Sequence, residues 1–386
     1  MSFHPVITPI FSNVTLQFQN RIPLTVTTPE QKRTIVARWL LLGVAMLIIQ
    51  ILLGGVTRLT GSGLSITEWK PLMGALPPMS ENAWQIAFEK YKGIAQYKYM
   101  NAHFTLSDFK SIYFWEWMHR EWARLVGVVF LIGFLYFLAK KYFDQRMVMP
   151  FAVLFILGGL QGALGWIMVQ SGLNDTNLYV NHIRLSIHFI AALILLCYTL
   201  WFALILLVPA EKRVVNKRFF VFTLLTIGFL FIQLFYGAFM AGLKAAPVAA
   251  TWPTLNGQWI PDQVNTYGNQ TFTSIAQYVS HPVAVQFIHR TLAYILCGLL
   301  LAWFLVAGKV AKRQPGSLLA RTRHWPLLLV LIQALLGILT VLNASNTISG
   351  HFGLFEWLAE AHQLIAMFLL ITLVINLYSI KIADRP

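Results

Sequence analysis

The sequence is poor in charged residues and in cysteine. Only 11% of its 386 residues are charged, whereas a typical soluble domain carries about 25%. Hydrophobic residues make up 57%, and the mean hydropathy is +0.64. This composition excludes a water-soluble globule of this size and a disordered chain. The two cysteines, Cys197 and Cys297, both lie in apolar runs, so the loops hold none for a disulfide framework. We therefore expect an integral membrane protein.

Apolar runs recur along the chain at lengths that can cross a bilayer. A hydrocarbon core of about 30 Å requires a helix of about 20 residues. The segment before Arg38 is polar and lacks the apolar core of a signal peptide, so it is expected to be a tail. The sequence predicts an all-α fold with eight transmembrane helices, over Arg38–Val56, Glu116–Ala139, Val148–Val169, Arg184–Val208, Phe219–Gly242, Val283–Gly308, Trp325–Asn343 and Leu358–Ile380.

Basic residues gather on one side of these predicted helices. The two chain ends and the segments after the second, fourth and sixth helices hold 18 Lys and Arg against 4 Asp and Glu. The opposite side holds 11 basic and 10 acidic residues. The positive-inside rule then places both termini in the cytoplasm. The net charge of +15 is thus a topology signal, and nucleic acid is not expected as a partner.

The chain repeats itself at a spacing of about 170 residues. The second and sixth helices share His-Arg-x-x-Ala, and the fourth and eighth share His-x-x-x-Ala. Each half contains four helices, so both halves enter the membrane from the same side. The repeat predicts two tandem four-helix bundles related by a pseudo-twofold axis, at residues 38–210 and 211–380, with cytoplasmic tails at 1–37 and 381–386.

The four odd-numbered helices share a different motif, Gln-x-x-x-Gly. Its two residues lie on one helix face. The glycine permits close approach of a neighbouring helix or a flat ligand, and the amide can form hydrogen bonds between helices. Whether the motif serves a ligand or only holds the bundle together stays open. The motif occurs at Gln50 and Gly54, Gln161 and Gly165, Gln233 and Gly237, and Gln333 and Gly337.

One histidine lies near the outer end of each even-numbered helix: His119, His188, His289 and His362. A single membrane histidine is usually a hydrogen-bonded packing residue. Four at matching depth, two in each bundle, favour ligands instead. Zinc requires three or four converging ligands, whereas two opposed imidazoles suit the axial positions of a haem iron. The sequence therefore predicts two haem sites.

Arginines accompany these histidines at the outer helix ends. They are Arg120, Arg124, Arg184 and Arg290. In these positions their guanidinium groups are expected to bind haem propionates through charge-assisted hydrogen bonds. The simpler interpretation is that they extend to the membrane interface, but that interpretation does not explain their placement beside histidine.

Glu116 precedes His119 by three residues, whereas the matching position before His289 holds Gln286. A carboxyl group beside a metal can act as a base on bound water, and an amide cannot. The difference predicts chemistry in the first bundle and a permanent electron-transfer haem in the second. The simpler interpretation is that Glu116 only pairs with Arg120, one helical turn away.

The segment after the first helix reads GGVTRLTGSGLSITEWKPLMGALPP, and FWEWMHR follows further on. Together with the eight helices and the four histidines, these strings resemble haem A synthases of the Cox15-like type over nearly the whole chain. The resemblance implies oxidation of the C8 methyl of haem O to a formyl group, which gives haem A for cytochrome c oxidase. It also implies that His119 and His188 hold the substrate haem, that Glu116 assists, and that His289 and His362 hold haem b.

The resemblance further implies a cell inner membrane location, with haem O synthase and cytochrome c oxidase assembly factors as partners beside the membrane lipid. A homo-oligomer is compatible with the sequence. The long outer segments are rich in aromatic and turn residues, which favours ordered caps. Within the first, a lid is expected from Arg58, Thr60, Ser62 and Trp69.

Two other functions remain as alternatives. A dihaem b-type quinol oxidoreductase that leaves its haem unmodified would hold haems at different depths, but all four histidines lie near one face. A transporter would place ionisable residues near the bilayer midplane, where the predicted helices have almost none.

Overall fold

The computed structural model describes residues 28–69, 74–268, 270–346 and 352–382. Within them, eight helices or helical segments are long and apolar enough to cross a membrane. The predicted spans are confirmed, and the chain is an all-α, multi-pass membrane protein. The eight helices are α1 (Pro29–Leu59), α3 (Leu106–Ala139), α4 (Val148–Gln170), α5 (His182–Leu207), α6 (Lys217–Gly242), α8 (Pro282–Ala311), α10 (Trp325–Leu342) and α11 (Leu354–Tyr378).

Several of the long helices, α1 and α3 among them, begin at residues that cap a helix N-terminus. Thr28 accepts a hydrogen bond from the backbone of α1, and Pro29 occupies its first turn. Thr105 and Asp108 form a capping box at the start of α3. Such side chains satisfy N–H groups that have no partner within the helix. Two helices begin nine or more residues earlier than predicted: residues 29–37 of the expected tail belong to α1, and α3 starts ten residues sooner. Residues 1–27 and 383–386 of the expected tails lie outside the described residues.

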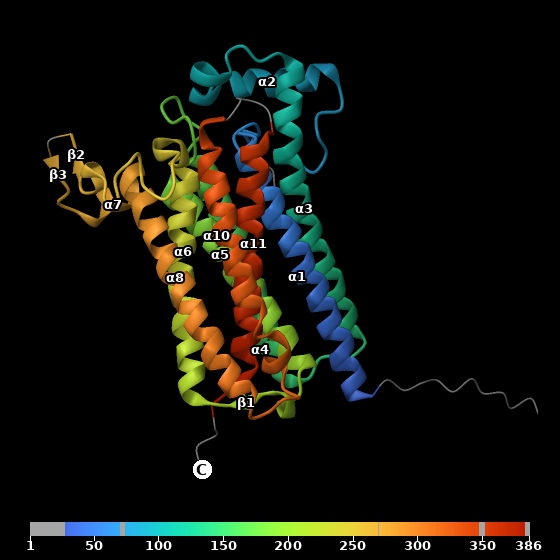
Figure 1. Cartoon of the computed structure of the whole chain (residues 1–386). Coiled ribbons are helices and arrows are strands. Elements are labelled where there is room, and N and C mark those ends of the chain that lie inside the picture. Colours follow the sequence, from blue (N-terminus) through green and yellow to red (C-terminus); the bar gives the residue numbers. More distant parts are fainter. Residues whose placement is uncertain (1–27, 70–73, 269, 347–351, 383–386) are drawn as a thin grey trace, which may run out of the picture.

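We divide the eight helices by chain order into a first set, α1, α3, α4 and α5, and a second set, α6, α8, α10 and α11; that each set is a bundle of its own stays a prediction. In the first set, α1 contacts α3 and α5, and α4 contacts α5. In the second set, α6 contacts α8 and α11, and α10 also contacts both. Helix α5 packs on α6 and α11, and α1 packs on α11, so the two sets lie side by side (Figure 1). A pseudo-twofold relationship between the sets stays a prediction.

The larger of two clusters of buried apolar residues in the described part of the chain includes residues from both sets. Two parallel strands, β1 (Val214–Val215) and β4 (Ile380–Lys381), join the linker between the sets to the end of α11. Arg213 reinforces this junction by donating to the carbonyl of Tyr378 at 2.7 Å. Short helical turns connect the long helices near this end: η2 (Gln145–Met147), η3 (Ala210–Lys212) and α9 (Leu318–Thr322).

The opposite end, which we call the loop end, carries the two long connections. The first contains α2 (Glu81–Lys92) and a π-helical turn, η1 (Tyr97–Asn101), and α2 lies across the helix ends (Figure 1). Phe88, Tyr91 and Phe109 belong to a second buried cluster beneath it. Its described residues thus form an ordered cap, as expected. The rest of the loop end consists of η4 (Ala246–Ala249), η5 (Asp262–Val264), β2 (Thr266–Tyr267), β3 (Gln270–Thr271), α7 (Ile275–Ser280) and η6 (Ala344–Asn346).

Candidate functional site

Each of the four helix histidines lies against the glycine of a Gln-x-x-x-Gly motif on a neighbouring helix. A Cβ atom added at each glycine would come within 2.8 to 3.3 Å of an imidazole atom. Real Cβ contacts of that length are rare, so glycine is needed for the ring to occupy its position. The structure therefore joins two sequence patterns that are far apart along the chain, in the pairs Gly54–His119, Gly165–His188, Gly237–His289 and Gly337–His362.

The glutamines of the same motifs hydrogen-bond to three of the histidine rings. The Nε2 atoms of Gln161 and Gln233 lie 3.2 Å from Nδ1 of their histidines, and Nε2 of Gln333 lies 3.1 Å from Nε2 of His362. The amide oxygens of these three glutamines, and that of Gln50, are buried without a hydrogen-bond partner. An amide oxygen that can still accept a hydrogen bond is therefore buried on each of the four helices that the histidines pack against.

The two histidines of the second set face each other. The ring centroids of His289 and His362 are 6.4 Å apart, and their planes are inclined by 76°. A metal bonded to one nitrogen of each ring at about 2 Å would hold the centroids roughly 6 Å apart. In the first set, His119 lies against Gly54 of α1 and His188 against Gly165 of α4. The spacing in the second set is thus compatible with one metal ion held by both rings.

Glu116 is buried, with 2% of its surface exposed, and both of its carboxylate oxygens accept hydrogen bonds. Its Oε2 accepts hydrogen bonds from Ser65 Oγ at 2.7 Å and from the backbone N–H of Ile66 at 2.8 Å. Its Oε1 accepts from Arg120 Nη2 at 2.6 Å. The simpler interpretation, pairing with Arg120, is therefore present in the structure, and the carboxylate also fastens the segment after α1.

The four arginines beside the histidines contact protein groups. Arg120 also donates to the backbone carbonyls of Ile66 and Glu68, and Arg290 to that of Thr254 at 2.9 Å. Arg124 forms an ion pair with Glu121. Arg184 donates to the carbonyl of Ile167 at 3.0 Å and remains exposed. Their expected role toward propionates stays a prediction.

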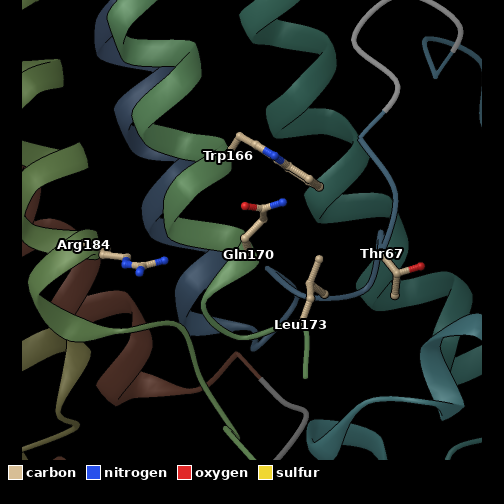
Figure 2. A pocket seen from close by; sticks show the side chains of 5 residues that line it. All are labelled: Thr67, Trp166, Gln170, Leu173 and Arg184. Atoms are coloured by element: carbon tan, nitrogen blue, oxygen red, sulfur yellow. The ribbon is translucent and has the colours of Figure 1, made fainter. Parts of the chain in front are cut away.

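A cavity of about 420 Å³ opens at the loop end, lined by the end of α4, the start of α5 and the segment after α1. Its wall includes Trp166, which follows Gly165 directly, and Arg184, one turn before His188. Figure 2 shows these side chains around one space together with Thr67, Gln170 and Leu173. Sequence reasoning missed most of this wall, because the residues come from three separate segments.

An aromatic pair lies at the edge of this cavity. Trp69 packs against Trp166 with ring centroids 4.8 Å apart. The hydroxyls of Thr60 and Ser62 lie 2.7 Å from each other, in the turn that follows α1. Of the four expected lid residues, Trp69 is thus the one that the structure places against the cavity wall.

Comparison with known proteins identifies the family of this chain. Residues 37–374 match the model of the cytochrome oxidase assembly protein family. This match covers most of the sequence. The chain belongs to that family.

Curated relatives within the family agree in length as well as in sequence. A protein of Flavobacterium psychrophilum named Heme A synthase is 39% identical over 345 residues, which cover 88% of this chain and 96% of the relative. The Heme A synthase of Bradyrhizobium sp. (strain ORS 278) is 40% identical over 83% of this chain and 86% of its own. That of Paracoccus denitrificans is 38% identical over 86% and 85%.

The family match includes all four histidines and their glycines. It begins next to Arg38 and ends four residues before Tyr378, the last residue of α11. Both helix sets and both long connections therefore lie within it. Ser65 and Ile66, two of the three hydrogen-bond partners of Glu116, also lie within the match, although no spacing along the chain connects them with that residue.

Proposed function

We propose that this chain is a haem A synthase, which oxidises the C8 methyl group of haem O to the formyl group of haem A. Its relatives that carry the name Heme A synthase align with it over most of both chains. The observation that carries the proposal in this chain is the set of four histidines, each resting on a glycine of the neighbouring helix.

The residues around the histidines fit a haem in each helix set. Each glycine leaves its imidazole ring free of a side chain on the neighbouring helix, and buried amide oxygens beside the rings still lack partners. We assign the substrate haem O to His119 and His188 and a resident haem b to His289 and His362. The 6.4 Å spacing of the second pair supports that assignment.

A resident haem b supplies one-electron redox chemistry, which the side chains of this protein lack. The first histidine pair would hold the substrate haem, and Glu116 lies three residues before His119 on the same helix. Oxidation of a methyl to a formyl group releases protons, and Glu116 is the buried carboxylate beside this pair that can accept one. Ser65, Ile66 and Arg120 hold it in place through both oxygens.

The cavity lined by Trp166 and Arg184 supports a role in substrate binding. Arg184 reaches it with an exposed guanidinium group, so we assign Arg184 to a propionate of the substrate. Arg120, Arg124 and Arg290 would first have to leave the protein groups that they contact. Trp69 packs on Trp166 at the edge of the same space and would restrict the entry of water.

The charge asymmetry supports an orientation with both termini in the cytoplasm. The loop end and the four histidines then lie toward the outer face of a cell inner membrane. Haem O synthase and cytochrome c oxidase assembly factors are the partners that this function implies, since they supply the substrate and use the product.

Co-expression with a source of haem O tests the proposed function. The haems are extracted from purified protein and separated by chromatography. A haem A synthase yields haem A together with haem B, and haem A is absent when the chain is omitted. Haem B alone, in cells that contain haem O, would contradict the proposal and favour an electron carrier.

A further inference from the structure

A buried carboxyl group lies between the two helix sets and has no part in the proposed reaction. Glu360 on α11 is 4% exposed, and neither of its carboxylate oxygens has a hydrogen-bond partner among the described residues. Burial of a carboxylate without compensating hydrogen bonds is costly. The presence of this carboxyl group in an apolar helix therefore calls for a role.

Glu360 lies directly on the backbone of α1. A Cβ atom added at Gly55 would overlap the Glu360 carboxylate, so the close approach of the two helices requires glycine there. Gln363, on the next turn of α11, donates to the backbone carbonyl of Ile51 at 3.3 Å. Glu360 and Gln363, two polar side chains of α11, thus contact consecutive turns of α1.

This contact lies between the two candidate haem sites. On α1, Gly55 follows Gly54, which packs against Nε2 of His119. On α11, Glu360 precedes His362 by two residues. The Glu360 carboxylate therefore lies on the chain of contacts that leads from His119 through Gly54 and Gly55 to α11, which carries His362.

Arg58 is the positive charge that acts on Glu360. It lies three residues after Gly55 on α1, so it shares the helix face that the Glu360 carboxylate contacts, and the two side chains carry opposite charges. Among the described residues, no hydrogen bond or direct ion pair engages either side chain. The two charges therefore act on their surroundings through space, and the apolar helices around them screen their fields weakly.

We propose that Arg58 and Glu360 form an electrostatic pair that sets the reduction potential of the haem held by His289 and His362. This inference rests on the proposed function, because it requires that haem. The ferric form carries one more positive charge than the ferrous form. A nearby carboxylate stabilises the ferric form and lowers the reduction potential, and a guanidinium group raises it. Neither residue is a catalytic residue, since neither contacts the reacting atoms.

A redox titration of the purified full-length protein tests the pair, with the reduced fraction read from the absorbance of haem b. At the wild-type midpoint the ratio of reduced to oxidised haem is unity. Glu360→Gln is expected to raise this ratio about tenfold, which is about 59 mV for a one-electron couple. Arg58→Gln is expected to lower it, and the double variant R58Q/E360Q to return it toward unity.

Three further variants separate the charge effect from packing. Glu360→Asp and Arg58→Lys keep the charges and should keep the wild-type potential. Gln363→Leu removes a contact with the same stretch of α1 without changing a charge, so it should lower stability but leave the potential unchanged.

Two results would overturn the inference. One is a ratio within twofold of unity in both Glu360→Gln and Arg58→Gln while haem b stays bound. The other is a shift in Gln363→Leu as large as in Glu360→Gln, which would make packing the cause. Absence of haem b from the wild-type protein would contradict the proposed function itself, and is seen before any variant is measured.

Discussion

Glu116 and Gln286 occupy matching positions of the two halves, and each fastens the long connection of its own half. Glu116 accepts a hydrogen bond from Ser65 Oγ at 2.7 Å, and Gln286 donates to the carbonyl of Ala249 at 2.8 Å. The two positions therefore share a structural task. They differ in that the carboxylate of Glu116 can accept a proton and the amide of Gln286 cannot.

Replacement of Glu116 by glutamine separates its hydrogen bonding to the long connection from its ability to accept a proton. The amide oxygen can still accept from Ser65, so we expect the variant to fold and to keep its haem. Loss of a proton acceptor should reduce haem A formation by about 10²- to 10⁴-fold, measured by chromatography of extracted haems. Gln286→Glu is the matched control and should leave the product yield unchanged. Normal haem A output from Glu116→Gln would dismiss a catalytic role.

The second histidine pair is tested by removing one ligand at a time. His289→Ala or His362→Ala should abolish the absorbance of haem b, because each variant leaves one axial ligand where two are needed. The first pair should still bind substrate haem. His103→Ala serves as the control, since this histidine is exposed in the loop-end cap. A full haem b spectrum in either of the first two variants would refute the pairing.

The helices and the histidine sites could be predicted because their signals repeat along the chain. Apolar length alone predicted eight spans, and the structure has them. The pairing of each Gln-x-x-x-Gly motif with a histidine was open, because a helix pattern shows which residues share a face but not which helix lies opposite. The contact of Gly165 with His188 resolves this point in favour of close packing around a ring.

Contacts between distant segments could not be predicted from the sequence. Glu360 meets Gly55 across more than 300 residues of sequence, and no periodicity links the two. Arg290 seemed available for a propionate, yet its guanidinium group binds the carbonyl of Thr254. Backbone carbonyls compete for arginine wherever a loop folds back over a helix end, and the path of such a loop depends on tertiary packing.

The glycines beside the histidines provide a graded test. An alanine at Gly165 would bring Cβ to 2.8 Å from Cε1 of His188, whereas one at Gly237 would lie 3.3 Å from His289. We therefore expect a greater loss of bound haem in Gly165→Ala than in Gly237→Ala, with overpacking that costs about 1–3 kcal/mol. Haem content by the pyridine haemochrome assay measures it. Gly162→Ala is the control, because a Cβ there meets no atom within 4 Å. Equal haem content in all three variants would contradict the inference that the glycines make room for the imidazole rings.

The loop-end cap is expected to lose stability at alkaline pH through Tyr91. Its hydroxyl donates to Gln96 at 2.9 Å and accepts from Asn101 at 2.7 Å, and burial raises its pKa to about 12. A tyrosine in the unfolded chain titrates near pH 10, so between pH 10 and 12 the unfolded state loses a proton that the folded state keeps. Stability therefore falls as the pH rises through this window.

Tyr91→Phe removes this contribution but leaves two buried polar groups short of a partner, which costs about 1–3 kcal/mol at neutral pH. Thermal unfolding and limited proteolysis of the cap at pH 7 and pH 10.5 measure both effects, with the exposed Tyr99→Phe as the control. An identical pH dependence in Tyr91→Phe and wild type would contradict the assignment.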